Sequence, residues 1–149
     1  MRVDVANQAG ADLFLSIHNN GSLNPAERGT EIWYDSGRTF ADRNLTLAEL
    51  ALHNITQRLR AAGYDGISRG VREDSHFRVF RDRPFPLFVL GPGTTGFRSY
   101  EPTAMPGILG ETLFLTNASD AAALRQPAAL QAIAAGYRDA VAGYFRQFA

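Results

Sequence analysis

The chain has 149 residues, and its fifteen basic residues, all Arg, balance fifteen Asp and Glu, so the formal net charge is zero. This length predicts a single domain over residues 1–149. The balanced charge argues against a nucleic acid as partner. The lack of cysteine excludes disulfides, thiolate metal sites and cysteine nucleophiles. We recognise no signal peptide in the sequence, and no apolar run reaches the roughly 18 residues that a membrane span needs.

The first half of the chain predicts two strands and a helix after an opening segment, RVDVANQAGA at 2–11, that resembles the end of a helix. Residues 12–17, DLFLSI, form an almost continuous apolar run, which is typical of a strand buried on both faces of a parallel sheet. The segment GTEIWYD at 29–35 alternates and is rich in aromatic and β-branched residues, so it predicts a second strand. Apolar residues then recur at helical spacing over 48–62, and Gly63 stands where a C-terminal cap belongs.

The second half predicts further strands, a long loop and a closing helix. Residues 66–84 are expected to form loops around a short strand, PLFVL at 86–90 a strand, and 91–106 a long loop that could border a substrate groove. GILGETLFL at 107–115 predicts another buried strand. From Pro127, apolar residues keep helical spacing to the end of the chain, with Leu130 and Phe145 on the stripe expected to be buried. Alternating strands and helices predict an α/β domain, layered, with a mainly parallel sheet flanked by helices.

Two polar residues stand out at the predicted strands. His18 directly follows the apolar run 12–17, and open α/β sheets bind ligands outside the C-terminal ends of their strands. Spacing alone leaves open whether it is a hydrogen-bonded structural residue or a metal ligand. Glu111 lies inside an apolar run, with no basic residue between Arg98 and Arg125. Because an unpaired buried carboxylate is costly, Glu111 either faces a cleft, a distant partner or a metal-activated water, or it caps a loop or pairs with an Arg.

Several blocks of the sequence resemble, in order and approximate spacing, the zinc-dependent N-acetylmuramoyl-L-alanine amidase family. These blocks are R-x-x-x-A-N at residues 2–7, ADLFLSIHNN at 11–20, GTEIWYD at 29–35, MPGILGETLFLTN at 105–117 and the aromatic C-terminal helix. The combination of S-I-H-x-N with a later P-x-x-L-x-E-x-x-F-x-x-N is specific, although neither half is so alone. The resemblance covers nearly the whole chain.

The resemblance implies hydrolysis of the amide bond between N-acetylmuramic acid and the L-alanine of the stem peptide in peptidoglycan, with zinc as cofactor. It implies that His18 binds the zinc and that Glu111 takes a proton from the attacking water and passes it to the departing nitrogen. By the same resemblance we expect a monomer that acts in the cell wall, the periplasm or outside the cell. Only a few residues separate 29–35 from the following helix, so we expect none of the autoinhibitory helix that some family members insert there.

The chain also departs from the family pattern. The family's first zinc-binding histidine, in a Gly-His-Gly segment, and a zinc-binding glutamate would both precede residue 1. With one of three ligands, we expect the chain alone neither to retain zinc nor to cleave peptidoglycan. Two alternatives stay open: a non-catalytic peptidoglycan-binding remnant of such an amidase, and a zinc peptidase on a related scaffold.

The remaining polar candidates have less specific predictions. We expect His53 and His76 to be surface residues and not ligands. Glu31 is expected to be structural or to line a groove. The Arg residues at 69, 72, 78, 81 and 83 predict a solvated rim, or a surface that binds the carboxylates of muropeptides.

Overall fold

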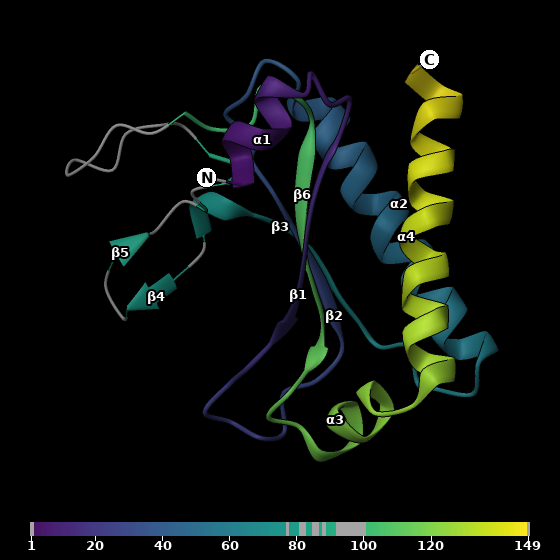
Figure 1. The fold of residues 1–149 in the computed structure, drawn as a ribbon. Coiled ribbons are helices and arrows are strands. Elements are labelled where there is room, and N and C mark those ends of the chain that lie inside the picture. Colours follow the sequence, from purple (N-terminus) through teal and green to yellow (C-terminus); the bar gives the residue numbers. More distant parts are fainter. Residues whose placement is uncertain are drawn as a thin grey trace.

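The fold pairs one sheet with a layer of two long helices. The computed structural model describes residues 2–76, 78–80, 83–84, 87, 89–91 and 101–148. Its elements are α1 (Arg2–Gln8), β1 (Phe14–Asn20), β2 (Thr30–Tyr34), α2 (Ala41–Ala61), β3 (Ser68–Glu73), the 3-10 turn η1 (Asp74–His76), β4 (Arg78–Phe80), β5 (Arg83–Pro84), β6 (Gly107–Phe114), α3 (Ala118–Leu124) and α4 (Pro127–Phe148). The long helices α2 and α4 stand side by side on one face of the sheet (Figure 1). The predicted α/β class is confirmed.

The main sheet has the strand order β1-β6-β2-β3. The outer pairs β1/β6 and β2/β3 are parallel, whereas the central pair β6/β2 is antiparallel. The sheet is therefore mainly parallel, as predicted, but it contains one antiparallel pairing that the sequence pattern did not indicate. As a consequence, the C-terminal ends of β1 and β6 lie at the same edge of the sheet as the N-terminal ends of β2 and β3.

The hydrophobic core fills the space between the sheet and the two helices. Ile32 and Ile108 of the sheet are fully buried there against Leu47 and Ile55 of α2. The helices approach closely at Gly136 of α4, where a Cβ atom would lie 2.6 Å from the Cα of Ile55. The small residue is therefore what allows the two backbones to come together.

The helix boundaries largely follow the sequence pattern. Helix α2 begins at Ala41, seven residues before the stretch 48–62 in which the sequence shows helical spacing. Gly63, just after the C-cap of α2, has the positive φ of 86° that suits glycine. The C-terminal helix begins at Pro127 as predicted. The short α3 was not predicted, although Asn117 caps it by accepting from the backbone N–H groups of Ser119 and Asp120.

Three predictions about strands and packing need correction. The run 12–17 is not buried on both faces, because Ile17 is 58% exposed and none of its residues is fully buried; β1 also stands at the end of the strand order. Of the strand predicted at 86–90, residues 89 and 90 lie in a turn closed by bonds from the N–H groups of Leu90 and Gly91 to the carbonyl of Leu87, while 86 and 88 fall outside the described residues. In α4, Leu130 and Phe145 are 50% and 39% exposed, because the helix buries mainly its small residues and tyrosines.

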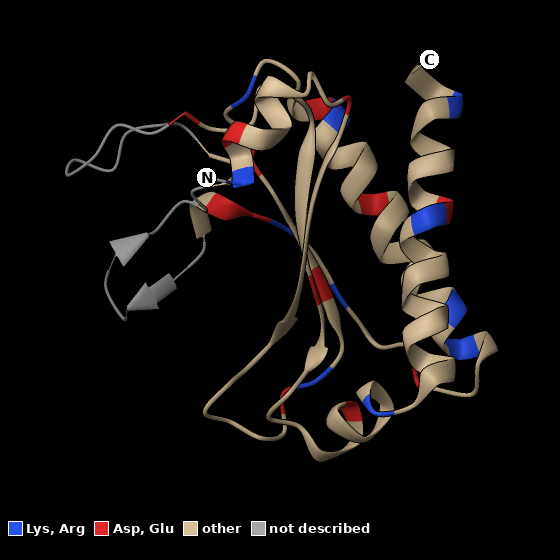
Figure 2. Cartoon of the chain, in the orientation of Figure 1, with Lys and Arg blue, Asp and Glu red and all other residues tan. Residues whose placement is uncertain are grey.

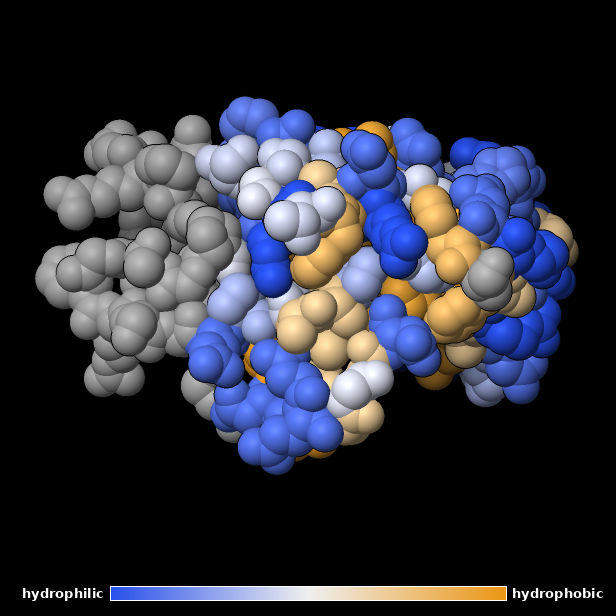
Figure 3. Space-filling view, turned by 90° about the horizontal axis from the view of Figure 1, so that it is seen from above, coloured by the Kyte–Doolittle hydropathy of each residue, from blue (hydrophilic) through white to orange (hydrophobic). Residues whose placement is uncertain are grey.

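Most of the loop predicted at 91–106 falls outside the described residues, but 101–106 contain neither helix nor strand, as expected. Within 66–84 the sequence predicted loops around one short strand, whereas the structure has β3 in the main sheet and the short strands β4 and β5, which pair with each other in a second sheet. Seen from above, the described surface carries apolar residues in small patches broken by hydrophilic ones (Figure 3). Among the described residues, no helix combines the length and the hydropathy that crossing a membrane requires.

Candidate functional site

His18 and Glu111 are neighbours across the sheet. They are register partners on the parallel strands β1 and β6, so their side chains leave the same face. That face is the one opposite the helices, because a Cβ atom on the adjacent Gly110 would run into the hydroxyl of Tyr137 in α4. The sequence placed both residues near the ends of strands, and the structure brings them together in the C-terminal halves of β1 and β6. His18 is exposed, however, and its strand continues to Asn20.

The row of facing residues continues into the other half of the sheet. Glu111 is also the register partner of Glu31 in β2, and Glu31 is in turn the partner of Gly70 in β3. Three chemistry-bearing side chains, from His18, Glu111 and Glu31, thus lie in one line across three strands. Figure 2 shows acidic residues in the middle of the sheet with basic residues close by. This line of polar groups is the candidate site.

Glu111 is a half-buried carboxyl group with an open hydrogen-bonding position. Its Oε2 atom is buried and has no hydrogen-bond partner within the described part of the chain. Burial, followed by repulsion from Glu31, raises the pKa of Glu111 to about 7. The prediction that Glu111 pairs with an Arg is not met among the described residues, since the arginines near this line bind Glu31 instead. Glu111 therefore faces the site with a free acceptor.

Glu31 is the buried hub of the site, with only 6% of its surface exposed. Its Oε1 atom accepts hydrogen bonds from Asn20 Nδ2 at 2.8 Å and from Trp33 Nε1 at 3.2 Å. Its Oε2 atom accepts a hydrogen bond from Arg69 Nε at 3.0 Å and forms an ion pair with Arg72 Nε at 3.1 Å. The expectation of a structural or groove-lining residue is met, but the sequence analysis missed that Glu31 gathers both arginines. An acid in an alternating strand, followed by an Arg-rich segment, was the available signal.

A β-bulge near the end of β6 shapes the site. The register of β1 and β6 shifts between His18 and Asn20, and Leu113 has a φ of 68°, which is unusual for a side chain of its kind. The shift turns Leu113 into the helix-side core and brings Phe114 to the face that carries Glu111. Arg69 then lies over the Phe114 ring, with its guanidinium carbon 4.8 Å from the ring centroid.

An open pocket of about 330 Å³ lies on this side of the sheet, over the Glu31 hub. Its lining includes Asn20, Glu27, Glu31, Trp33, Arg69, Arg72, His76 and Phe114. His76 is exposed, as predicted, and belongs to this pocket's wall, whereas His53 is exposed on α2, away from the site. Of the predicted arginine rim, the side chains at 78, 81 and 83 fall outside the described residues.

The described residues do not supply the full set of ligands that zinc requires. Among the described residues, no group of three or more His, Cys, Asp or Glu side chains is arranged so that it could hold a metal ion. His18 Nε2 is hydrogen-bonded to Ser16 Oγ at 2.9 Å, and Glu31 is occupied by its arginines. The described residues therefore fit one zinc ligand and not a complete zinc site.

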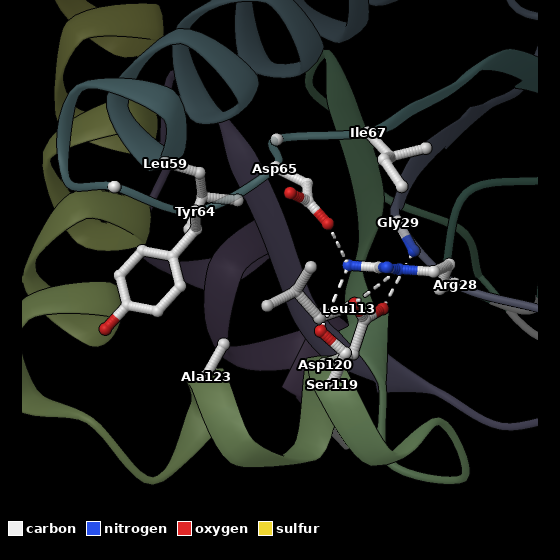
Figure 4. Close-up of a pocket in the computed structure, with 12 residues that line it drawn as sticks. Arg28, Gly29, Leu59, Tyr64, Asp65, Ile67, Leu113, Ser119, Asp120 and Ala123 are labelled. Atoms are coloured by element: carbon white, nitrogen blue, oxygen red, sulfur yellow. Dashed lines mark hydrogen bonds and ion pairs between the residues drawn. The ribbon is translucent and has the colours of Figure 1, made fainter.

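A second, smaller cavity of about 130 Å³ lies beneath α3 and is structural in character (Figure 4). There the buried carboxylate of Asp120 accepts from the backbone N–H of Gly29 at 2.8 Å and from that of Phe114 at 3.0 Å. Arg28 bridges this carboxylate to the exposed Asp65. Asp120 thus ties the start of β2 to the end of β6, two segments that flank the line of Glu31 and Glu111.

Comparison with known proteins adds independent information. Residues 1–143 match the N-acetylmuramoyl-L-alanine amidase family. The N-acetylmuramoyl-L-alanine amidase LytC of Bacillus subtilis is 33% identical over 145 residues, which are 97% of this chain and 24% of LytC. The amidase AmiA of Salmonella typhimurium is 28% identical, over 99% of this chain and 56% of AmiA. The chain therefore spans from about a quarter to a little over half the length of these relatives.

Solved structures agree with the fold. The catalytic domain of the amidase CwlV from Bacillus (Paenibacillus) polymyxa superposes with a TM-score of 0.65 at 28% identity, covering 97% of this chain and 64% of that one. The amidase of Clostridium difficile 630 superposes with a TM-score of 0.69, over 99% of this chain and 65% of its own, and at 24% identity it supports the fold. With the match over residues 1–143, these findings confirm the resemblance found in the sequence: the chain belongs to the N-acetylmuramoyl-L-alanine amidase family.

Proposed function

We propose that this chain, once further zinc ligands complete its site, hydrolyses the amide bond between N-acetylmuramic acid and L-alanine in peptidoglycan. The observation that carries the proposal is the pairing of His18 with Glu111, whose buried Oε2 atom has no hydrogen-bond partner among the described residues. Family membership supports the same reaction. A substrate of this kind would place the protein's work in the cell wall, and we expect it to act as a monomer.

Glu111 is suited to move a proton in such a reaction. An amide is cleaved when water attacks its carbonyl carbon and the nitrogen leaves with an added proton, so one group must accept a proton and later donate it. A carboxyl group whose pKa is raised to about 7 exists in both forms near neutral pH. Glu111 would take the proton of the water as a carboxylate and give it to the departing L-alanine nitrogen as an acid.

Zinc belongs to this proposal as the family's cofactor, and when bound it would polarise the scissile carbonyl and acidify the attacking water. His18 would supply one imidazole ligand. A zinc ion would need further ligands beyond those that the described part of the chain supplies. The proton transfers above are therefore assigned to Glu111 alone.

The direct test is to identify the bond that is cut. The chain would be incubated with purified peptidoglycan in zinc-containing buffer, both alone and fused behind the segment of LytC that precedes its matching region. Mass spectrometry of the soluble products should reveal free stem peptides that begin with L-alanine from the fusion, and none from the chain alone. Binding to peptidoglycan without hydrolysis by either protein would support the non-catalytic alternative, whereas cleavage within the peptide would support a peptidase.

A further inference from the structure

Two guanidinium groups beside the candidate site are held in place from two directions. Arg69 donates from Nε to Oε2 of Glu31 at 3.0 Å, and Arg72 forms an ion pair through its Nε with the same oxygen at 3.1 Å. Each also lies over an aromatic ring: Arg69 is 4.8 Å from the centroid of Phe114, and Arg72 is 5.8 Å from that of Trp33. Flexible arginines anchored in this way lose less conformational entropy when they bind a ligand.

Within the described part of the chain, the outer nitrogens of both groups have only long contacts. A guanidinium group carries five N–H donors; Glu31 takes the Nε donor of Arg69 and forms an ion pair at the Nε of Arg72. Arg69 Nη2 lies 3.6 Å from Glu27, whose side chain is 40% exposed, and Arg72 Nη2 lies 3.4 Å from the carbonyl of Arg69. The side chains of Arg69 and Arg72 are 24% and 43% exposed, so an incoming ligand can reach them.

A purely structural link between β2 and β3 would need one of these arginines and not both. Two guanidinium groups that share a single oxygen of Glu31 repel each other, and Glu27 offsets this only through a long, solvent-screened contact. A second carboxylate placed between their outer nitrogens would relieve the repulsion and form charge-assisted hydrogen bonds. The pocket of about 330 Å³ offers room for it.

The distance between the two arginines and Glu111 matches the length of a short extended peptide. Arg69 and Arg72 belong to β3, which lies two strands from β6, so about 10 Å separates the strands at the usual spacing. An extended peptide advances about 3.4 Å per residue. A carboxylate on the residue after the L-alanine would then lie about 7 Å from the scissile amide, within reach of an arginine side chain.

We propose that Arg69 and Arg72, anchored by Glu31, form a subsite that binds a carboxylate of the peptide attached to the scissile amide. The identity of that peptide rests on the proposed function. The subsite itself is a property of this pocket and needs neither turnover nor metal.

Binding of two matched ligands to the purified chain tests the subsite. The ligands are N-acetylmuramoyl-L-alanyl-D-glutamate and the same compound with its α-carboxylate converted to an amide, measured by isothermal titration calorimetry. The wild-type chain should bind the carboxylate form about tenfold or more tightly than the amide. Arg72→Gln and Arg69→Gln should each remove most of this preference while leaving the affinity for the amide within about twofold.

Arg58→Gln is the matched control, because Arg58 pairs with Asp139 on the helix side, away from the pocket. It should keep the full preference. Equal affinities of the wild-type chain for the two ligands, no binding of either, or an unchanged preference in both pocket variants would overturn the subsite. Stem-peptide release is measured separately. Preference for the carboxylate without hydrolysis would support the subsite and contradict the proposed activity. Hydrolysis without that preference would contradict the subsite alone.

Discussion

His18 and Glu111 lie side by side on parallel strands as register partners, although they are far apart in the sequence. Because hydrogen-bonded strands fix this pairing, the relative position of imidazole and carboxyl group depends on the sheet and not on a loop. The same row continues to Glu31, so the sheet also fixes the acid that repels Glu111 and gathers the arginines. A site built on strands holds its groups more rigidly than one built on loops.

Packing of the two helices gives the first prediction. Gly136→Ala should destabilise the fold by roughly 1–3 kcal/mol, because the new Cβ would lie 2.6 Å from the backbone of Ile55, which cannot move aside cheaply. Gly143→Ala in the same helix is the control, since its Cβ would meet the tips of two flexible side chains, Leu50 at 3.3 Å and Arg146 at 3.6 Å. Alanine's higher helix propensity should leave that variant neutral or more stable. Urea unfolding measures both, and equal stabilities would contradict the close helix approach.

The hydrogen bonds and the ion pair of Asp120 predict that its replacement lowers the stability of the fold strongly. Asp120→Ala should lower the free energy of unfolding by about 3–5 kcal/mol, because it removes the buried partner of Arg28 and leaves the backbone N–H groups of Gly29 and Phe114 unbonded in the interior. Asp65→Asn breaks only the exposed end of the same ion-pair chain and should cost less than about 1 kcal/mol. Thermal or urea unfolding of both variants checks the contrast. Similar costs for the two would show that Asp120 is not the anchor.

Asp74 predicts how stability changes with pH. Burial, and then the nearby Asp35, raise the pKa of Asp74 to about 6, so the folded chain holds this proton more tightly than the unfolded chain. Its contribution is therefore fully present below about pH 4 and is lost as the pH rises through 6, by up to about 3 kcal/mol. Asp74→Asn keeps an acceptor for the N–H of Leu87 and should remove this part of the pH dependence. The measurement is the free energy of unfolding of both proteins at several pH values from 4 to 8. The same dependence on pH in the two proteins would contradict this role of Asp74.

Glu31 predicts a shift in the titration of its neighbour. Replacing Glu31 with Gln removes the second cause of the raised pKa of Glu111, so that pKa should fall below about 7 but stay above its ordinary value because burial remains. Carbon-13 NMR of the labelled carboxyl groups follows this directly. Glu49→Gln, an exposed change on α2, is the control and should leave the titration of Glu111 unchanged. A pKa of Glu111 that stays the same or rises in the Glu31 variant would contradict the proposed repulsion.

The sequence predicted the elements whose patterns are local. Periodicity located α2 and α4, and the apolar run around Glu111 located β6 with its single acid. The family blocks selected His18 and Glu111, and the register of β1 and β6 then placed them together. Each of these signals is contained in a short stretch of residues.

The features that the sequence did not reveal depend on long-range pairing. The antiparallel contact of β2 with β6 brings Glu31 next to Glu111, and no local pattern encodes which strands become neighbours. The run 12–17 is apolar as buried strands are, yet it lies at the sheet edge, because burial depends on what packs against it. The arginines of β3 likewise looked like a solvated rim until the fold placed Glu31 beneath them.

The central claim is that Glu111 moves the proton in amide hydrolysis, and its replacement by Gln tests this most directly. The measurement is the rate of stem-peptide release from purified peptidoglycan by the fused chain described above, compared with Glu111→Gln and with the control Glu49→Gln. Because Gln keeps the size of the side chain but cannot accept and return the proton, the rate should fall by about 10²–10⁴-fold, with the fold intact by circular dichroism and the control at the wild-type rate. A Glu111→Gln variant that releases stem peptides at a rate close to wild type would contradict the account.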